Sequence, residues 1–255
     1  WVGGSLARLT AAAAAADVIH LHGARTPMAL WGALAARLAD RPTVYTPHCY
    51  YDHGGPALRI AKRLWDQTAE RFLTGGAATV ILLDDWWTAD LARRSLKPVR
   101  TVVVPNCVLA ADVRARAAVL PPIRLEGEPA LATVGRLDPV KRIDDAIRAL
   151  AQPGMEQATL HVAGTGGDRT RLEQAAAEAG VADRVRFYGW LPDAEAARLI
   201  AGADVFALPS EREGLPTAML EALLLGTPAI ASAIDGNRAI ADAVGWNGLF
   251  PLGDP

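Results

Sequence analysis

Lysine, cysteine and aromatic side chains are scarce in this sequence of 255 residues, which has 3 lysines, 2 cysteines and 6% aromatic residues. Cys49 and Cys107 are too few for a disulfide scaffold and lie too far apart for a metal-ligand motif, so we expect a reducing compartment. No apolar run approaches the roughly 18 residues that span a bilayer, and no signal-peptide pattern opens the sequence. We therefore expect a cytoplasmic protein, with at most a peripheral position at the inner face of the cell membrane.

The charge composition argues against a nucleic-acid-binding protein, because the formal net charge is only -2. A hydrophobic content of 51% excludes disordered, collagen-like and coiled-coil chains. Residues 1–118 hold 14 Arg and Lys against 9 Asp and Glu, whereas residues 119–255 hold 12 against 19. Halves of opposite sign suggest two modules, the basic one suited to an anionic membrane or an anionic acceptor, although surface variation alone would also give this split.

Short apolar runs alternate with longer amphipathic runs along the chain, which predicts parallel strands connected by helices. The predicted strands are 18–21, 43–46, 79–83, 101–104, 131–134, 159–162, 184–188, 205–208 and 229–231. The predicted helices are 5–16, 27–39, 57–73, 88–96, 142–151, 169–179, 194–201, 217–225 and 237–244. The fold class is therefore α/β, with doubly wound, Rossmann-like sheets.

The alternation stops over residues 105–128, where proline and glycine are dense and the charge changes sign. We place a domain boundary there, giving domains 1–118 and 119–255 that face each other across a cleft. The first domain has four predicted strands where such sheets often have six, and residue 1 is Trp. We expect a piece of a longer protein, without the glycine-rich loop that usually follows the first strand; Gly3-Gly4 precedes the wrong helix for that role. The last segment, 248–251, is expected to stop just as a further strand would begin.

The densest group of candidate site residues is Pro209–Glu221, which follows a predicted strand and begins a helix. Ligands bind at this end of the strands in open α/β sheets. Pro216 suits a first helical turn, Gly214 allows a close backbone approach, and the free amides of the helix start favour a diphosphate. Taken alone, Glu213 and Glu221 are also compatible with a solvated helix cap.

Two further strand ends carry candidate residues. Arg136 and Lys141 flank a turn into a helix, as phosphate-binding side chains do, although a basic surface loop would have the same pattern. Gly164-Thr165-Gly166-Gly167 has part of a dinucleotide fingerprint. No acidic residue follows at the spacing that a nicotinamide site requires.

Taken together, these motifs resemble family four of the retaining glycosyltransferases, which have the GT-B fold. In the second domain the resemblance rests on Glu213-x7-Glu221, Gly135-Arg136-Leu137 with Lys141, and the runs 183–189 and 223–231. In the first domain and the connection it rests on Asp17–Gly23, Tyr45–His48 and Val104-Pro105-Asn106. It covers essentially the whole chain.

The resemblance implies a role for each candidate residue. Glu213, His22, Arg136 and Lys141 are the catalytic candidates, with Arg136 and Lys141 on the donor diphosphate and Glu213 facing the donor sugar. Glu221 would hold the ribose hydroxyls, and His22 and His48 would border the acceptor. The remaining donor-binding candidates are Gly164, the backbone of Trp190 and Leu191, which would recognise the base, and Gly214, Leu215, Pro216 and Thr217, whose amides would stabilise the leaving diphosphate.

The implied reaction moves a sugar from a UDP-, GDP- or ADP-sugar to a polysaccharide or lipid-linked acceptor. Fixed cations and amides stabilise the departing diphosphate in such a transfer. No Asp-x-Asp metal motif is present, so we expect neither a metal ion nor another cofactor. The sequence departs from the family at Cys107, where glycine is usual, and at Asp84–Trp87, where Trp86 and Trp87 are expected to pack rather than bind sugar.

Two other functions remain open at this stage. The chain could bind a nucleotide sugar without transferring it, because the first domain looks incomplete. A sugar-nucleotide epimerase of the same fold would need a second set of carboxylates or histidines opposite the sugar, and we find no such set in the sequence.

Overall fold

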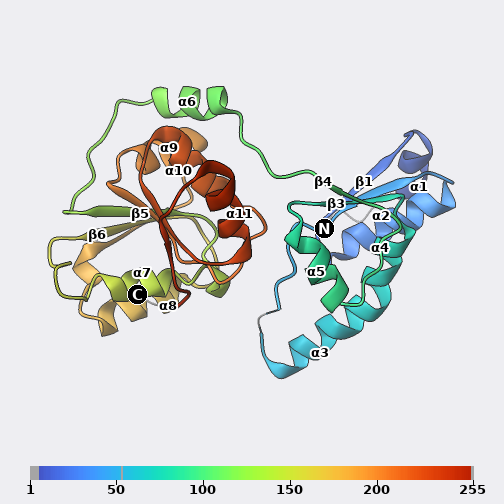
Figure 1. The fold of residues 1–255 in the computed structure, drawn as a ribbon, viewed down its shortest axis with the longest axis horizontal. Coiled ribbons are helices and arrows are strands. Elements are labelled where there is room, and N and C mark those ends of the chain that lie inside the picture. Colours follow the sequence, from blue (N-terminus) through green and yellow to red (C-terminus); the bar gives the residue numbers. More distant parts are fainter. Residues whose placement is uncertain (1–5, 53, 254–255) are drawn as a thin grey trace. The chain divides into compact units, whose positions relative to one another are not determined.

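The computed structural model describes residues 6–52 and 54–253, which form two compact units, 1–105 and 106–255 (Figure 1). Each unit is a parallel sheet with helices packed against it, so the predicted α/β class is confirmed. All nine predicted strands are present within one residue of their predicted bounds. Gly3 and Gly4 lie outside the described residues.

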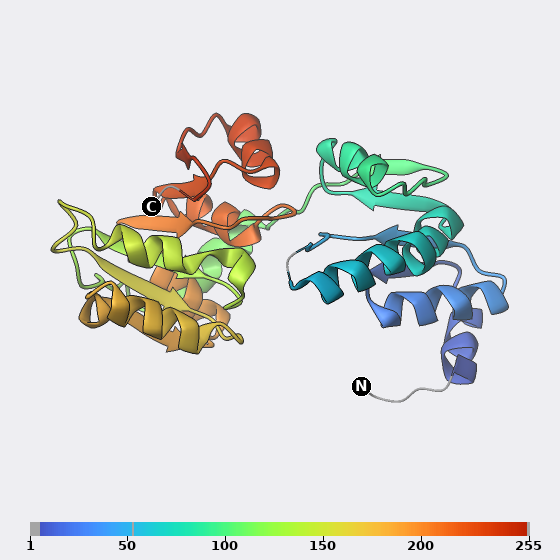
Figure 2. The same ribbon diagram turned by 90° about the horizontal axis from the view of Figure 1, so that it is seen from below.

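In the first unit, the described residues form a sheet with the strand order β1-β2-β3-β4. Its strands are β1 (Ile19–His22), β2 (Thr43–Thr46), β3 (Thr79–Leu82) and β4 (Thr101–Val103). Its helices are α1 (Leu6–Ala14), α2 (Pro27–Leu38), α3 (Pro56–Trp65), α4 (Arg71–Gly76) and α5 (Trp86–Arg93). Between α3 and α4 the chain forms a π-helical turn, η1 (Asp66–Glu70), without an intervening loop, as Figure 2 shows.

In the second unit, the described residues form a sheet with the order β10-β9-β8-β5-β6-β7. Its strands are β5 (Ala130–Val134), β6 (Thr159–Ala163), β7 (Val185–Gly189), β8 (Val205–Leu208), β9 (Ala229–Ser232) and β10 (Leu249–Phe250). Its α-helices are α6 (Ala110–Ala118), α7 (Ile143–Ala149), α8 (Arg169–Glu178), α9 (Asp193–Ala201), α10 (Thr217–Leu225) and α11 (Asp235–Val244). The 3-10 turns are η2 (Pro139–Lys141) and η3 (Ala182–Arg184).

The central strands β5 and β8 of the second sheet are buried on both faces, which explains why their sequences are mostly apolar. Strand β5 shows the alternation: Leu131 packs into a core with residues of α7 and α8, whereas Ala130 and Ala132 pack with Leu199 of α9. Figure 1 shows α7 and α8 on one side of this sheet and α9 and α10 on the other. Small residues on the second face let α9 approach the sheet closely.

The strand order reverses at β5, which pairs with β6 on one side and with β8 on the other. The connections after β5 and β8 therefore leave the sheet in opposite directions. This leaves a crevice at the carboxyl ends of the two strands, the usual position of a ligand in such sheets. The topology thus predicts that residues after Val134 and after Leu208 meet in one site.

Helix α6 corrects two expectations from the sequence. Residues 105–128 are not a continuous irregular linker, because α6 forms within them and packs against α9 and α10 (Figure 1). The division between units falls after Pro105 rather than after residue 118. The helix escaped prediction because it buries only Val113 and lies between proline-rich segments, so it has little apolar periodicity.

The end of the chain differs from expectation as well. We expected the chain to stop where a further strand would begin, but Leu249 and Phe250 pair with Ala231 and Ser232 as strand β10. In the part of the chain that the structure describes, no helix is both long enough and apolar enough to cross a membrane.

Candidate functional site

The loop after β5 brings Lys141 to the switch point of the second sheet. Asp138 starts the turn η2 by accepting a hydrogen bond from the amide of Val140, and Pro139 supplies the fixed φ that a first turn favours. Arg142 then adopts a left-handed conformation with φ +48° and ends the turn. Lys141 is the last residue of η2, and its side chain is 21% exposed.

Lys141 contacts the loop after β8 through Glu213. Its Nζ donates a 2.7 Å hydrogen bond to Oε1 of Glu213, whose side chain is 7% exposed. The backbones of the two loops are joined as well, because the amide of Glu211 donates to the carbonyl of Val140 at 2.8 Å. The structure therefore brings together two residues that the sequence placed on separate strand ends, 72 positions apart.

Helix α10 begins directly after this loop. Gly214, Leu215 and Pro216 are buried, whereas Thr217, the first helical residue, is exposed. Pro216 is the N-cap residue, and its side chain has no acceptor that could cap the first amides of the helix. Those amides and the positive end of the helix dipole form a local anion-binding environment beside Lys141 and Glu213.

Glu221 lies one helical turn after Thr217 in α10. It has a hydrogen-bonding partner that the sequence did not indicate. Its Oε1 accepts a 2.8 Å hydrogen bond from Nη2 of Arg116, a residue of α6. Glu221 and Glu213 thus have different cationic partners, although both were expected in one pocket. No pattern in the sequence could have paired residues 105 positions apart.

The other expected donor-site residues occupy neighbouring strand ends. Arg136 is 60% exposed in its side chain and lies 3.6 Å from Asp138, so its guanidinium can turn toward a ligand. Trp190 and Leu191 lie in the turn between β7 and α9. The Trp190 side chain is 71% exposed, and Leu191 packs on the core below the sheet.

Gly164 follows β6 and allows the loop after β5 to approach. Its φ is +137°, and a Cβ at this position would lie 1.8 Å from the carbonyl oxygen of Gly135. Glycine is therefore required both by the backbone angle and by the contact with the neighbouring strand end. Gly164, the first glycine of the incomplete dinucleotide fingerprint, thus lets its loop pack against Gly135, in the loop that precedes Lys141.

In the first unit, the two predicted histidines lie in contact. Nδ1 of His22, at the end of β1, is 2.9 Å from Nε2 of His48, which follows β2 with a left-handed φ of +64°. The His20 ring lies 3.9 Å from that of His22. Burial, and then the neighbouring His22 and His20, lower the pKa of His48, which favours the neutral form of this imidazole.

A buried polar network, which sequence reasoning missed, holds the segments that carry these histidines. Arg25, just after β1, forms two 2.7 Å hydrogen bonds to Asp66 in η1. Arg94 bonds to Asp52 and to Asp66, which ties the end of α5 to the segment after His48. The Asp52 side chain is 49% exposed; its partial desolvation is outweighed by hydrogen bonds from Arg94 and Arg25, which lower its pKa, so it remains a carboxylate.

Glu70 is the most buried member of this network, with 0% exposure. Its Oε1 accepts hydrogen bonds from the hydroxyls of Tyr45 and Tyr50, and its Oε2 accepts one from the amide of Arg25. Burial and the charge of Glu70 raise the pKa of both tyrosines, so both hydroxyls stay protonated and donate. The π-helical turn places Asp66 and Glu70 on the same side of the helix as these donors.

The remaining features of this unit are packing features. Trp87 is 1% exposed and stacks on Trp86 at 4.6 Å. The expectation that the two tryptophans pack rather than form an open sugar platform is confirmed for Trp87 and fits the partial burial of Trp86.

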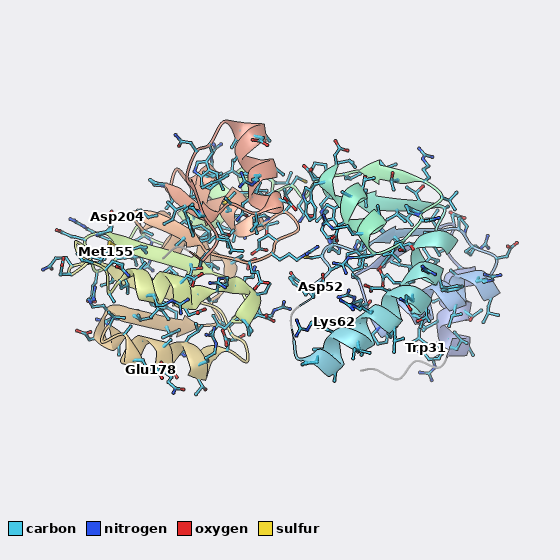
Figure 3. All side chains as sticks on the ribbon, turned by 60° about the horizontal axis from the view of Figure 1, so that its bottom comes forward. Trp31, Asp52, Lys62, Met155, Glu178 and Asp204 are labelled. Atoms are coloured by element: carbon cyan, nitrogen blue, oxygen red, sulfur yellow. The ribbon has the colours of Figure 1, made fainter. Side chains whose placement is uncertain are left out.

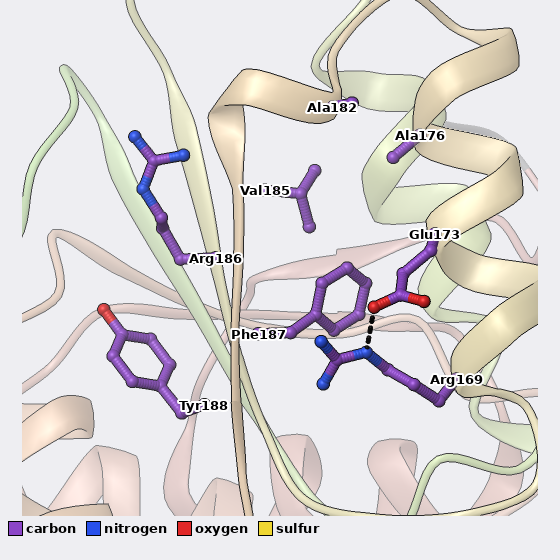
Figure 4. Close-up of a pocket in the computed structure, with 8 residues that line it drawn as sticks. All are labelled: Arg169, Glu173, Ala176, Ala182, Val185, Arg186, Phe187 and Tyr188. Atoms are coloured by element: carbon purple, nitrogen blue, oxygen red, sulfur yellow. Dashed lines mark hydrogen bonds and ion pairs between the residues drawn. The ribbon is translucent and has the colours of Figure 1, made fainter.

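A separate cavity of about 390 Å³ opens between α8 and the edge strand β7, as Figure 4 shows. The guanidinium of Arg169 lies 4.2 Å from the centre of the Phe187 ring and is held by Glu173. Tyr188 hydrogen-bonds to His161. None of the residues predicted from the sequence for the donor site lines this cavity.

Two parallel α/β sheets, the second with its strand order reversing at charged loops, define the chain as a protein of the GT-B fold. The chain belongs to the family described as glycosyl transferases group 1, whose model matches residues 121–250. Residues 3–107 match a second model, the glycosyl transferase 4-like domain.

Among curated proteins, the chain is 33% identical over 255 residues to the 2-deoxystreptamine N-acetyl-D-glucosaminyltransferase of Streptomyces fradiae. It is also 33% identical over 242 residues to the 2-deoxystreptamine glucosyltransferase of Streptomyces kanamyceticus. These matches cover 93% and 89% of this chain, but only 60% and 61% of the relatives. The chain therefore spans about three fifths of their length.

Among solved structures, HepE of Anabaena in complex with UDP and glucose matches with a TM-score of 0.77 and 25% identity. That match covers 98% of this chain and 68% of HepE. Sucrose-phosphate synthase of Thermosynechococcus elongatus also has a TM-score of 0.77, with 24% identity, over 98% of this chain and 64% of the synthase. The synthase supports the fold alone.

Gly164→Ala should destabilise the protein by about 2 kcal/mol or more, because alanine can relieve neither the backbone angle nor the clash with Gly135. Gly167→Ala is the matched control, since a Cβ there meets no atom within 4 Å. Urea unfolding followed by circular dichroism measures both. Equal unfolding midpoints for the two variants would show that the close approach is not needed.

Proposed function

We propose that the protein is a retaining glycosyltransferase of family four that uses a nucleotide-diphosphate sugar. The observation that carries the proposal is the ion pair between Lys141 and Glu213 at the switch point, directly before the free amides of α10. A cation and a helix N-terminus at this place suit a diphosphate. The curated relatives are named as glycosyltransferases, which supports the same activity.

In the proposed donor complex, Lys141 and Arg136 bind the diphosphate, Glu213 faces the sugar, and Glu221 holds the ribose hydroxyls. The amides of residues 214–217 bind the leaving phosphate, the backbone at Trp190 and Leu191 contacts the base, and Gly164 keeps the neighbouring loop close. His22 and His48 border the acceptor. Among the described residues, no group of three or more His, Cys, Asp and Glu could hold a metal ion; we propose transfer without a metal or other cofactor.

The proposed transfer breaks the bond between the sugar C1 and the diphosphate oxygen and forms a bond from C1 to an acceptor hydroxyl oxygen on the same face. The diphosphate leaves with the bonding electron pair, and its departing oxygen takes the proton that the acceptor hydroxyl loses. Negative charge grows on the diphosphate while C1 becomes oxocarbenium-like. Lys141 and the α10 amides lie where they can stabilise that charge, and loss of one such donor typically costs roughly 10²–10³ in rate.

We propose a polysaccharide or lipid-linked acceptor and a UDP-, GDP- or ADP-sugar donor. HepE was solved with UDP-glucose, so UDP-glucose is the first donor to test. The two Streptomyces relatives are named for transfer to 2-deoxystreptamine, and this small acceptor belongs in the same panel.

Lys141→Ala and Glu221→Ala should each weaken nucleoside diphosphate binding by about tenfold or more, because each removes a charged hydrogen-bonding partner of the ligand. Isothermal titration with UDP, GDP and ADP measures the loss. Lys97→Ala, which removes an exposed lysine of the first unit, is the control. Unchanged affinity in both site variants would contradict the proposed donor site.

The alternative is a protein that binds a nucleotide sugar without transferring it, since the chain spans only about three fifths of the relatives' length. Transfer predicts that an α-linked donor yields an α-linked product, visible by proton NMR, at a rate unaffected by EDTA. Glu213→Gln should lower this rate at least roughly 100-fold while largely keeping nucleotide affinity. Nucleotide binding without any product in the acceptor panel would favour the alternative.

We also propose that the protein is cytoplasmic and contacts the anionic inner face of the cell membrane. Helix α3 supports this proposal. None of its residues is buried, and Leu58, Ile60 and Leu64 are 49%, 60% and 58% exposed. By helical periodicity, the basic residues Arg59, Lys62 and Arg63 lie opposite an apolar face that includes Ile60 and Leu64. Figure 3 marks Lys62 on this helix. Such a helix suits the surface of a bilayer with anionic head groups.

Ile60→Asp should reduce binding to phosphatidylglycerol vesicles about tenfold, because it places a charge on the apolar face of α3. Val99→Asp is the control, since Val99 is 77% exposed but lies outside the helix. Vesicle sedimentation at low and high salt measures both. Equal binding to neutral phosphatidylcholine vesicles, or no loss in the Ile60 variant, would contradict an anionic lipid partner.

A further inference from the structure

The contact between Arg116 and Glu221 assigns a function to helix α6. We infer that Arg116 is a positioning residue, which holds the Glu221 carboxylate in the orientation that binds the ribose hydroxyls of the donor. This inference rests on the proposed donor site, but no motif of the sequence includes Arg116.

The position of Arg116 is fixed by packing on both sides of the contact. Val113, one turn earlier in α6, is 1% exposed, and α6 packs against α9 and α10. Asn106, at the start of the same segment, donates a 2.9 Å hydrogen bond from Nδ2 to the carbonyl of Leu215, just before α10. The segment is therefore attached both to the loop that precedes α10 and to the helix itself.

The geometry at Glu221 leaves room for a ligand. Arg116 donates from Nη2 to Oε1 at 2.8 Å, and within the described residues no donor reaches Oε2. A carboxylate has lone pairs for about four hydrogen bonds, so two hydroxyls can still bind. The side chains are 32% and 22% exposed for Arg116 and Glu221, which leaves the pair accessible to a ligand without full solvation.

Positioning matters here because a glutamate on a helix surface has several rotamers. Binding must otherwise select one of them, which costs side-chain entropy. The planar guanidinium of an arginine is pre-organised, so its hydrogen bond to a carboxylate costs less side-chain entropy than one from a flexible lysine. Arg116 also approaches Asp193 at the start of α9, at 3.8 Å, but that side chain is 81% exposed and contributes little restraint.

The test compares the nucleoside diphosphate that the wild type binds best with its 2′,3′-dideoxy form, by isothermal titration. Arg116→Ala should weaken binding of the ordinary nucleotide about fivefold to tenfold and change affinity for the dideoxy form less than twofold. Arg114→Ala is the matched control, because Arg114 is an exposed arginine of the same helix. It should leave both affinities unchanged.

A double-mutant cycle separates positioning from a direct effect. In a Glu221→Ala background, adding Arg116→Ala should cause no further loss, because the restrained carboxylate is already absent. Arg116→Lys keeps the charge without the planar group and should show an intermediate loss. Arg116→Lys also replaces Arg116→Ala as the test variant if the alanine substitution lowers the melting temperature.

Several results would overturn the inference. Equal losses for the ordinary and dideoxy nucleotides would mean that Arg116 acts only as a diffuse charge. Tighter binding of Arg116→Ala would mean that arginine competes with ribose for Glu221. A wild type that binds no nucleotide would overturn the donor site itself. A wild type that binds, with a weakened Glu221→Ala variant and an unaffected Arg116→Ala variant, would overturn only the role of Arg116.

Discussion

The proposed donor site of the second unit depends on the ion pair between Lys141 and Glu213. It links the loop after β5 to the loop after β8, where the order of the sheet reverses. Glu213 is nearly buried, so its charge needs a partner, and a bound diphosphate would give Lys141 a second one. The turn capped by Asp138, the close approach at Gly164 and the start of α10 all place groups around this pair. In the proposed donor complex, Lys141 and the start of α10 would bind the diphosphate, and the Glu213 carboxylate would lie beside the sugar.

In the first unit, buried carboxylates are also stabilised by partners from other elements, here in a larger hydrogen-bond network. Buried carboxylates at Asp66 and Glu70 are satisfied by two arginines and two tyrosines from other elements. Breaking one partner would leave a buried charge without compensation, which is costly. The network therefore fixes the segments after β1 and β2, and with them the contact between His22 and His48. Rigid segments of this kind would suit the proposed role of the two histidines at the acceptor.

The strands were predictable because they are short, mostly apolar runs, and β5 and β8 are also buried on both faces. The positions of Lys141 and Glu213 were predictable as well, because strand ends in such sheets carry the ligand site. Helix α6 was not predictable, since one buried valine gives no periodic signal. The partners of Glu221 and Glu70 were also hidden. Charged pairs formed across the fold depend on where helices pack, and single-sequence patterns report only neighbours along the chain.

A crystal structure of the protein with UDP, or with whichever nucleoside diphosphate binds, tests the central claim most directly. We predict that the diphosphate lies within hydrogen-bond distance of the Lys141 Nζ and the first amides of α10, and that the ribose hydroxyls bind to the Glu221 carboxylate. A nucleotide bound instead in the cavity beside Arg169 and Phe187, with the Lys141–Glu213 pair untouched, would contradict it.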